Sequence, residues 1–283
     1  MEIAVVTERI LTFKDDVTAT QAEELANQHK IGAFGTFNQV TSLWNKPKDD
    51  DFELIYQEHR FQPFWHVKGT AKYVYDRKAQ HAWPVAATEV QSLTLCGSEY
   101  EVKNGKINVE VLEHCQQQET KEIFVDGLSG KHHSHLSKYF EFKSSVVEKE
   151  ELEKLAQKSI IVPPQTRASA LVRDTASSMI RSIQADHIFE EKVELEHVDL
   201  YYRPLYLFKY KWLSKNKEAG IEVDALTGEV TYSDKMFSQL TGKVLDYDFL
   251  FDIGGDVAGT FIPGGNIAVK LTKKYIDVAH RKK

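Results

Sequence analysis

The chain has few of the features that would place it outside an ordinary reducing, aqueous compartment. Only two of its 283 residues are cysteines, too few to staple a fold of this size with disulfides. The segment Met1–Arg9 carries two acidic residues and no basic stretch before its short apolar run, unlike a secretory signal. No apolar run reaches the roughly 18 residues of a membrane-spanning helix. We therefore expect a soluble, cytoplasmic protein with no transmembrane span.

An excess of positive charge is also missing. The formal net charge is -6 and the sequence pI is near 6.0. Binding to a phosphate backbone requires a basic surface, so nucleic acid is an unlikely partner by charge.

Catalytic signatures are scarce as well. The sequence contains no Gly-x-Ser-x-Gly elbow, no His-Glu-x-x-His pair and no Cys-x-x-Cys pair. This favours a non-enzymatic protein, although it leaves an enzyme open.

The sequence does contain one turn pattern twice, Val125–Gly130 and Val223–Gly228, which reads Val-Asp-x-Leu-Ser/Thr-Gly. Aspartate caps nearby backbone N–H groups and glycine adopts positive φ, so each stretch predicts a tight turn after a strand. This capping role explains Asp126 and Asp224 without any catalysis. Aromatic segments precede both turns, and the alternation of Tyr206, Phe208 and Tyr210 with other residues predicts a strand with one buried face.

Helical patterns separate these strand regions. Thr20 and Glu23 have capping-box spacing at the start of a predicted helix over about 20–30. Further helices are predicted over 145–157, 166–185 and 267–279, and Asn104-Gly105 predicts a hairpin turn.

The order of helix, strands and Asp-x-Leu-Ser/Thr-Gly turn occurs in both halves, which indicates a degenerate duplication. We expect an α+β fold with two helix-on-antiparallel-sheet units, the first enlarged, and a C-terminal Gly-rich segment and helix. The predicted organisation is an enlarged unit at 1–143, a charged helical connector at 144–165, a second unit at 166–246 and the C-terminal segment at 247–283.

The second copy carries a family resemblance. Its aromatic strand is followed by Ile221-Glu222-Val223-Asp224-Ala225-Leu226-Thr227-Gly228-Glu229-Val230, and the region 166–232 resembles a PepSY-type domain. That resemblance implies a small α+β module that acts in binding, inhibition or regulation. The first copy departs from the pattern, with Gly127 and Ser129 in place of Ala and Thr and Lys131 after the turn.

One group of residues has the donor types of a zinc site. Zinc takes about four nitrogen or sulfur ligands, and zinc is the cofactor that this group would hold. Surface histidines and core thiols are the alternative interpretation, because neighbouring strand residues point to opposite faces. The candidate ligands are Cys96, His114, Cys115, His132, His133 and His135.

The Gly-rich C-terminal segment supports three interpretations. Its backbone N–H groups and a lysine could bind phosphate, its apolar and basic residues could contact a protein partner or a membrane surface, or it could be a turn and a docked helix. The candidate binding residues are Gly254, Gly255, Gly259, Pro263, Gly264, Gly265, Asn266 and Lys270.

These observations favour a non-enzymatic binding or regulatory protein that engages a protein partner or a membrane surface through its C-terminal segment. A zinc-dependent hydrolase or metal-binding protein is the first alternative, and a phosphate or nucleotide binder at Pro263–Asn266 is the second.

Overall fold

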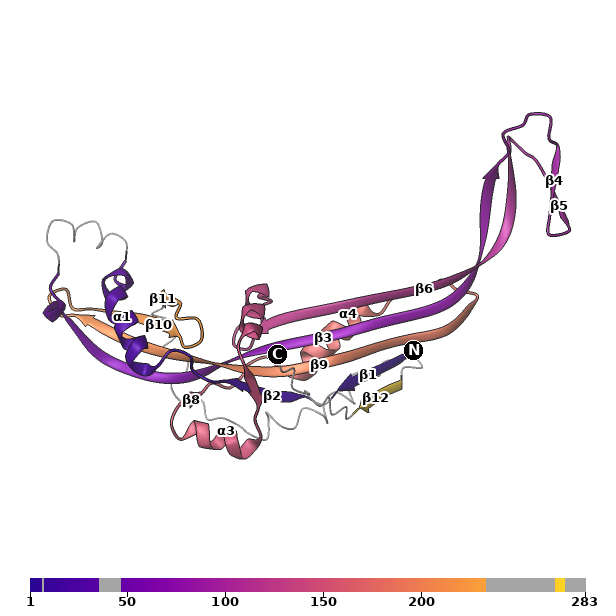
Figure 1. Ribbon diagram of the computed structural model, residues 1–283. Helices are drawn as coiled ribbons and strands as arrows, with labels where there is room; N and C mark the ends of the chain where they lie inside the picture. The colour runs from indigo at the N-terminus through magenta and orange to yellow at the C-terminus, as the bar shows by residue number, and fades with distance from the viewer. Residues whose placement is uncertain (7, 36–46, 233–267, 273–283) are drawn as a thin grey trace, which may run out of the picture.

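The computed structural model describes residues 1–6, 8–35, 47–232 and 268–272 (Figure 1). Strands dominate and helices pack beside them, so the predicted α+β class is confirmed. No helix within these ranges is both long and apolar enough to cross a membrane. The helices are α1 (Ala19–Ala33), α3 (Lys149–Ala156) and α4 (Ala168–Met179), with 3-10 helices η1 (Asp49–Asp51) and η2 (Ser134–Glu141).

The strands form one large mixed sheet and a small hairpin of β4 and β5. In chain order they are β1 (Glu2–Val6), β2 (Arg9–Phe13), β3 (Phe52–Pro84), β4 (Ser92–Leu95), β5 (Ser98–Glu101), β6 (Lys106–Asp126), β7 (Ser144–Val146), β8 (Ile160–Ile161), β9 (His187–Trp212), β10 (Lys217–Asp224), β11 (Val230–Tyr232) and β12 (Ala268–Thr272).

The antiparallel pair of β3 and β9 is the spine of the sheet, and it extends from Phe52↔Trp212 to Asp76↔His187. β6 pairs with the other edge of β3, whereas β10, β2 and β1 pair in turn with the other edge of β9. The two predicted units therefore share one sheet, because β3 comes from the first and β9 from the second.

Beyond Asp76, β3 continues with β6 as its only partner in the described chain. We call this two-stranded part, residues 77–84 and 106–113, the distal ribbon. It projects away from the rest of the molecule and carries the β4–β5 hairpin at its end (Figure 1). The predicted turn at its end is confirmed, since Asn104 and Gly105 have φ of 54° and 71°.

Strand alternation gives the spine two different faces. The helix face carries Trp65 and Val67, which pack against α4, and Tyr206 and Phe208, which pack against α1. The predicted buried face of β9 is thus confirmed. On the opposite face, which we call the η2 face, Phe64 and other aromatic side chains pack beneath η2.

Both repeated turns have the predicted geometry. Asp126 Oδ1 accepts hydrogen bonds from two backbone N–H groups of its turn, and Asp224 Oδ1 does the same. Gly130 and Gly228 have φ of 67° and 71°, which explains the glycine at each position. The capping interpretation of both aspartates is confirmed.

Helix boundaries differ from the sequence predictions in two places near the N-terminus and the middle of the chain. The capping box of α1 is formed by Thr18 and Gln21, two residues before the predicted pair, because Thr18 is the last extended residue. α4 ends at Met179, since the chain is extended at Ile180.

Two further predicted helices are partly strand. In the predicted helix 145–157 the first residues belong to β7, which pairs with β2, and the helix spans only Lys149–Ala156. Within the predicted helix 267–279, residues 268–272 instead form β12, parallel to β1. Pairing with the edge of the sheet outweighs helical propensity there, and the alternating sequence Ala-Val-Lys-Leu-Thr suits a strand. The rest of that predicted helix lies outside the described residues.

Candidate functional site

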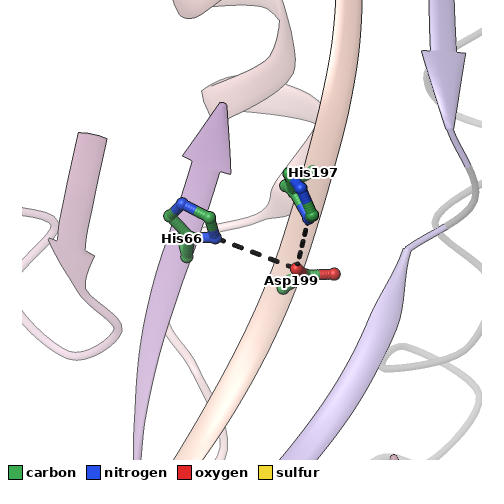
Figure 2. Close-up of side chains that lie close together, drawn as sticks. All are labelled: His66, His197 and Asp199. Carbon is green, nitrogen blue, oxygen red and sulfur yellow. Dashed lines mark hydrogen bonds and ion pairs between the residues drawn. The ribbon is translucent and has the colours of Figure 1, made fainter. Parts of the chain in front are cut away.

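Two histidines and an aspartate come together on the η2 face of the spine (Figure 2). His66 on β3 lies directly opposite Asp199 on β9 in the strand register. His197 precedes Asp199 by two residues, so both side chains project from the same face of β9. The antiparallel pairing of two distant segments thus builds the cluster.

The contacts within this His66–His197–Asp199 cluster are close. His197 Nδ1 lies 3.1 Å from Asp199 Oδ2, and His66 Nδ1 lies 3.8 Å from the same oxygen. The side chains of Asp199 and His66 are 1% and 4% exposed, whereas that of His197 is 30% exposed. The cluster is therefore buried on the spine side and reachable from solvent at His197.

Arg9 closes one side of the cluster. Its Nε and a terminal nitrogen donate to the two oxygens of Asp199 at 2.8 and 2.7 Å. A bidentate pair of this kind is strong and fixes the carboxylate plane. Burial acts to raise the pKa of Asp199, but the hydrogen bonds from His197 and Arg9 and the imidazole of His66 3.8 Å away outweigh it and hold that pKa well below its ordinary value.

The donor types of the cluster are those of a transition-metal site, although Arg9 already binds both oxygens of Asp199 and lies 3.2 Å from His197 Nδ1. Two imidazole nitrogens and a carboxylate oxygen all lie within 4.8 Å of one another. Zinc bonds to nitrogen and oxygen are about 2.0–2.2 Å long, so ligands of one ion lie roughly 3–4 Å apart. His66 Nδ1 is buried and has no hydrogen-bond partner in the described chain, whereas its Nε2 is 2.8 Å from Glu122. A carboxylate on the outer nitrogen is the usual support of a metal-binding histidine.

A second polar cluster lies farther along the η2 face. Tyr139 of η2 donates to Asp224 Oδ2 at 2.5 Å, and Arg203 donates to Tyr139, to Asp224 at 3.1 Å and to Gln62 at 3.1 Å. Burial raises the pKa of Tyr139, so the phenol stays protonated. This arrangement ties η2, β3, β9 and the second repeated turn together, and its groups are mutually satisfied.

The sequence-derived metal candidates are spread over the molecule. Cys96 is exposed in the β4–β5 turn, and His114 and Cys115 lie on β6 opposite Asp76 and Tyr75. His132 forms a bridge with Val125 at the far end of β6, and His133 and His135 flank the start of η2. The structure brings the rings of His133 and His135 together, but it does not unite these residues with the cysteines.

The C-terminal candidates fall almost wholly beyond the described part of the chain. Gly254, Gly255, Gly259, Pro263, Gly264, Gly265 and Asn266 lie outside the described residues. Lys270 lies on β12, opposite Ala4 of β1.

Sequence reasoning missed the histidine–aspartate cluster. The spacing of His197 and Asp199 was an available signal, because residues two apart on a strand share a face. The contribution of His66 depends on the β3–β9 register, which no local pattern reveals. Comparisons with protein-family models, with curated proteins and with solved structures found no match to this chain.

Proposed function

We propose that this chain is a non-catalytic binding protein and that the distal ribbon presents its main contact surface to a protein partner. The observation that carries this proposal is a two-stranded projection with large apolar side chains on both faces. Trp83 and Leu112 are 45% and 51% exposed. Leu112 shares a face with Lys78, its partner on β3. Trp83 is an odd number of residues from Lys78 along β3, so strand alternation puts it on the opposite face.

The composition of the projection favours a protein partner. Residues 77–113 contain five glutamates against four lysines and arginines, a net charge near −1. An arm that binds nucleic acid or an anionic membrane would be basic. Exposed aromatic and aliphatic side chains among mixed charges are instead typical of protein interfaces.

Capture from a native extract tests the proposal with three variants of the full chain. Trp83→Ala and Leu112→Glu should each remove the same co-purifying proteins while leaving the fold intact. The matched control is Leu213→Glu, because Leu213 is 49% exposed on the β9–β10 hairpin at the opposite end of the spine. Retention of the same proteins by both ribbon variants, at wild-type levels, would contradict the proposal.

The C-terminal segment stays a second proposed contact region, as the sequence predicted. Deleting residues 249–283 would also remove β12, a strand of the sheet. A truncation after Thr272 separates the two effects, because it removes the basic tail and keeps β12. Loss of liposome or partner binding in that truncation would support the tail as a contact.

Metal binding at the His66–His197–Asp199 cluster is the second candidate function. The buried Nδ1 of His66, which faces Asp199 at 3.8 Å without a hydrogen bond, favours it. Zinc titration by calorimetry should show one site that is lost in His197→Ala and retained in His81→Ala, where His81 is an exposed residue on the ribbon. Zinc binding that survives His197→Ala but fails in a triple variant of His132, His133 and His135 would favour the sequence-derived ligands.

The proposed duplication is supported by matching contacts in the two halves. The N–H of Gly127 donates to Pro63 O at 3.0 Å, and the N–H of Ala225 donates to Pro204 O at 3.1 Å. The carbonyl of Gly127 accepts from the chain entering α4, and that of Ala225 accepts from the chain entering α1. Each helix therefore packs on the hairpin of the other half. The PepSY resemblance of residues 166–232 remains a prediction for the second half.

This exchange of helices has a direct test. Fragments 1–143 and 144–283 should each fail to fold alone, since each lacks the helix that covers its own hairpin. Mixing them should restore the circular dichroism of the intact chain. Cooperative unfolding of either fragment alone would contradict the exchange.

A further inference from the structure

The outer edge of β6 is long and open. β6 pairs with β3 from Phe64↔Asp126 to Pro84↔Lys106 without a register shift. On its other edge, His132 and His133 bond only near Val125 and Phe124. Between residues 107 and 123 no strand in the described chain pairs with this edge, which runs along the outside of the sheet (Figure 1).

Several of the usual protections of an edge strand are missing here. Natural sheets interrupt exposed edges with proline, bulges, charged side chains or short strands. Residues 107–123 contain no proline and a single lysine, Lys121, and the pairing with β3 shows no bulge. β6 is also 21 residues long, several times the ordinary strand length of about 5–6. An edge of this kind is a template for another strand.

We propose that β6 pairs antiparallel with β6 of a second copy of this chain, about a twofold axis at Gln117. An antiparallel pair of identical strands has such an axis, and the contact closes a dimer. With Gln117 opposite its own copy, Glu113 faces Lys121, Val111 faces Ile123 and Gln116 faces Gln118. No like charges lie directly opposite each other between residues 111 and 123.

Shifting the axis by one residue shows that this register is selective. With the axis at Gln116, Glu113 would face Glu119 and Glu110 would face Glu122, each pair occurring twice. Like charges directly opposite across strands are destabilising. With the axis at Gln118, Glu113 would face Ile123, and its carboxylate would no longer lie opposite Lys121. Of these three registers, only the one with Gln117 on the axis places Glu113 opposite Lys121 without placing like charges opposite each other. It also places Leu112 opposite Glu122.

The surroundings of Gln117 leave room for such a contact. Gln116, Gln117 and Gln118 are exposed, and they line a surface hollow of about 430 Å³ with Tyr73 and Arg181. Their amide groups donate and accept hydrogen bonds equally well, so they suit a self-complementary centre. The residue that separates the proposed dimer from the partner proposed for the ribbon is Trp83, which lies on β3 and outside the paired stretch, whereas Leu112 lies within that stretch.

Cross-linking tests the axis directly. In a Cys96→Ser, Cys115→Ser background, Gln117→Cys should form an intermolecular disulfide, because Cα atoms directly opposite lie about 4.5–5.5 Å apart. Gln118→Cys is the matched control. Its two copies would be separated along the strands by about two residues in total, or roughly 6.8 Å. Added to the spacing between the strands, this puts the two Cα atoms beyond the roughly 7 Å limit for a disulfide. Equal cross-linking of both variants, or of neither, would overturn the register.

Charge reversal tests the pairing without cysteines. Sedimentation velocity should show a dimer for the wild-type chain, monomers for Glu113→Lys and for Lys121→Glu, and a restored dimer for the double variant. Circular dichroism confirms that each variant is folded, which matters because Glu113 also pairs with Arg77 within one chain. A wild-type chain that stays monomeric at about 100 μM would overturn the proposal, whereas capture of a partner through Trp83 would be unaffected.

Discussion

The distal ribbon and the rest of the sheet, which we call the body, share strands β3 and β6, yet the two tryptophans of β3 are buried very differently in them. Within the body, β9 completes the sheet and α4 covers the helix face, so Trp65 is 1% exposed. Beyond Asp76 both supports are lost, and Trp83 on the same strand is 45% exposed. The difference shows that burial here is set by the neighbours of a strand and not by the strand itself.

The two tryptophans give the strongest test of this comparison. Trp65→Ala should lower the free energy of unfolding by about 4 kcal/mol, because it empties a packed site and removes the indole N–H bond to Thr166 O. Trp83→Ala should change it by less than about 0.5 kcal/mol. Urea unfolding measures both, and equal losses would contradict the division into body and ribbon.

Removing an ion pair should likewise cost more stability in the body than on the ribbon. Asp199→Asn should cost about 2 kcal/mol, since it leaves the partly exposed Arg9 without its partner. Glu113→Gln, which removes an exposed pair on the ribbon, should have little effect.

The Asp199 effect should also depend on pH. The pKa of Asp199 is lowered in the folded protein, so its contribution is present above the unfolded value of about 3.9 and is lost as the pH falls through the folded value. Wild-type stability should therefore fall more steeply than that of Asp199→Asn below about pH 4. Parallel pH profiles of unfolding would contradict the lowered pKa.

The body and the ribbon should also differ, by a smaller free energy, in how well they tolerate added side-chain volume. A Cβ on Gly69 would lie 2.5 Å from Leu195 Cδ2 and 3.0 Å from Glu194 O, beside α4. Gly69→Ala should therefore destabilise the body by about 1–2 kcal/mol. Ala82→Val, which adds more volume on the exposed ribbon, should be nearly neutral. Thermal unfolding of the two variants distinguishes a packed strand from an open one.

Removing the ribbon should have the smallest effect. Replacing residues 78–112 with Asn-Gly joins Arg77 to Glu113, which already face each other, by a favoured two-residue turn. The urea midpoint should stay within error, because the ribbon buries little against the body. A marked loss of stability would show that the β4–β5 end supports the body.

Local patterns predicted what depends on near neighbours in the chain. Asp126 and Asp224 cap their own turns, and Asn104-Gly105 turns the hairpin, because these contacts span only a few residues. The helix predicted at 267–279 was wrong over 268–272, since the edge of β1, far away in the sequence, accepts that segment as a strand. Local patterns could not predict the hydrogen bonds to Oδ2 of Asp224 either, because Tyr139 and Arg203 reach that oxygen from other elements.

By itself, the sequence determined the α+β class, the buried face of β9 and the two repeated turns. All three follow from the period of apolar residues or from backbone demands within a few residues. Only the tertiary structure decided that His66 meets Asp199, that α1 and α4 pack on opposite halves, and that β6 is left with an open edge. Each of these depends on which distant strands pair and in what register, and pairing is decided by the free energy of the whole sheet.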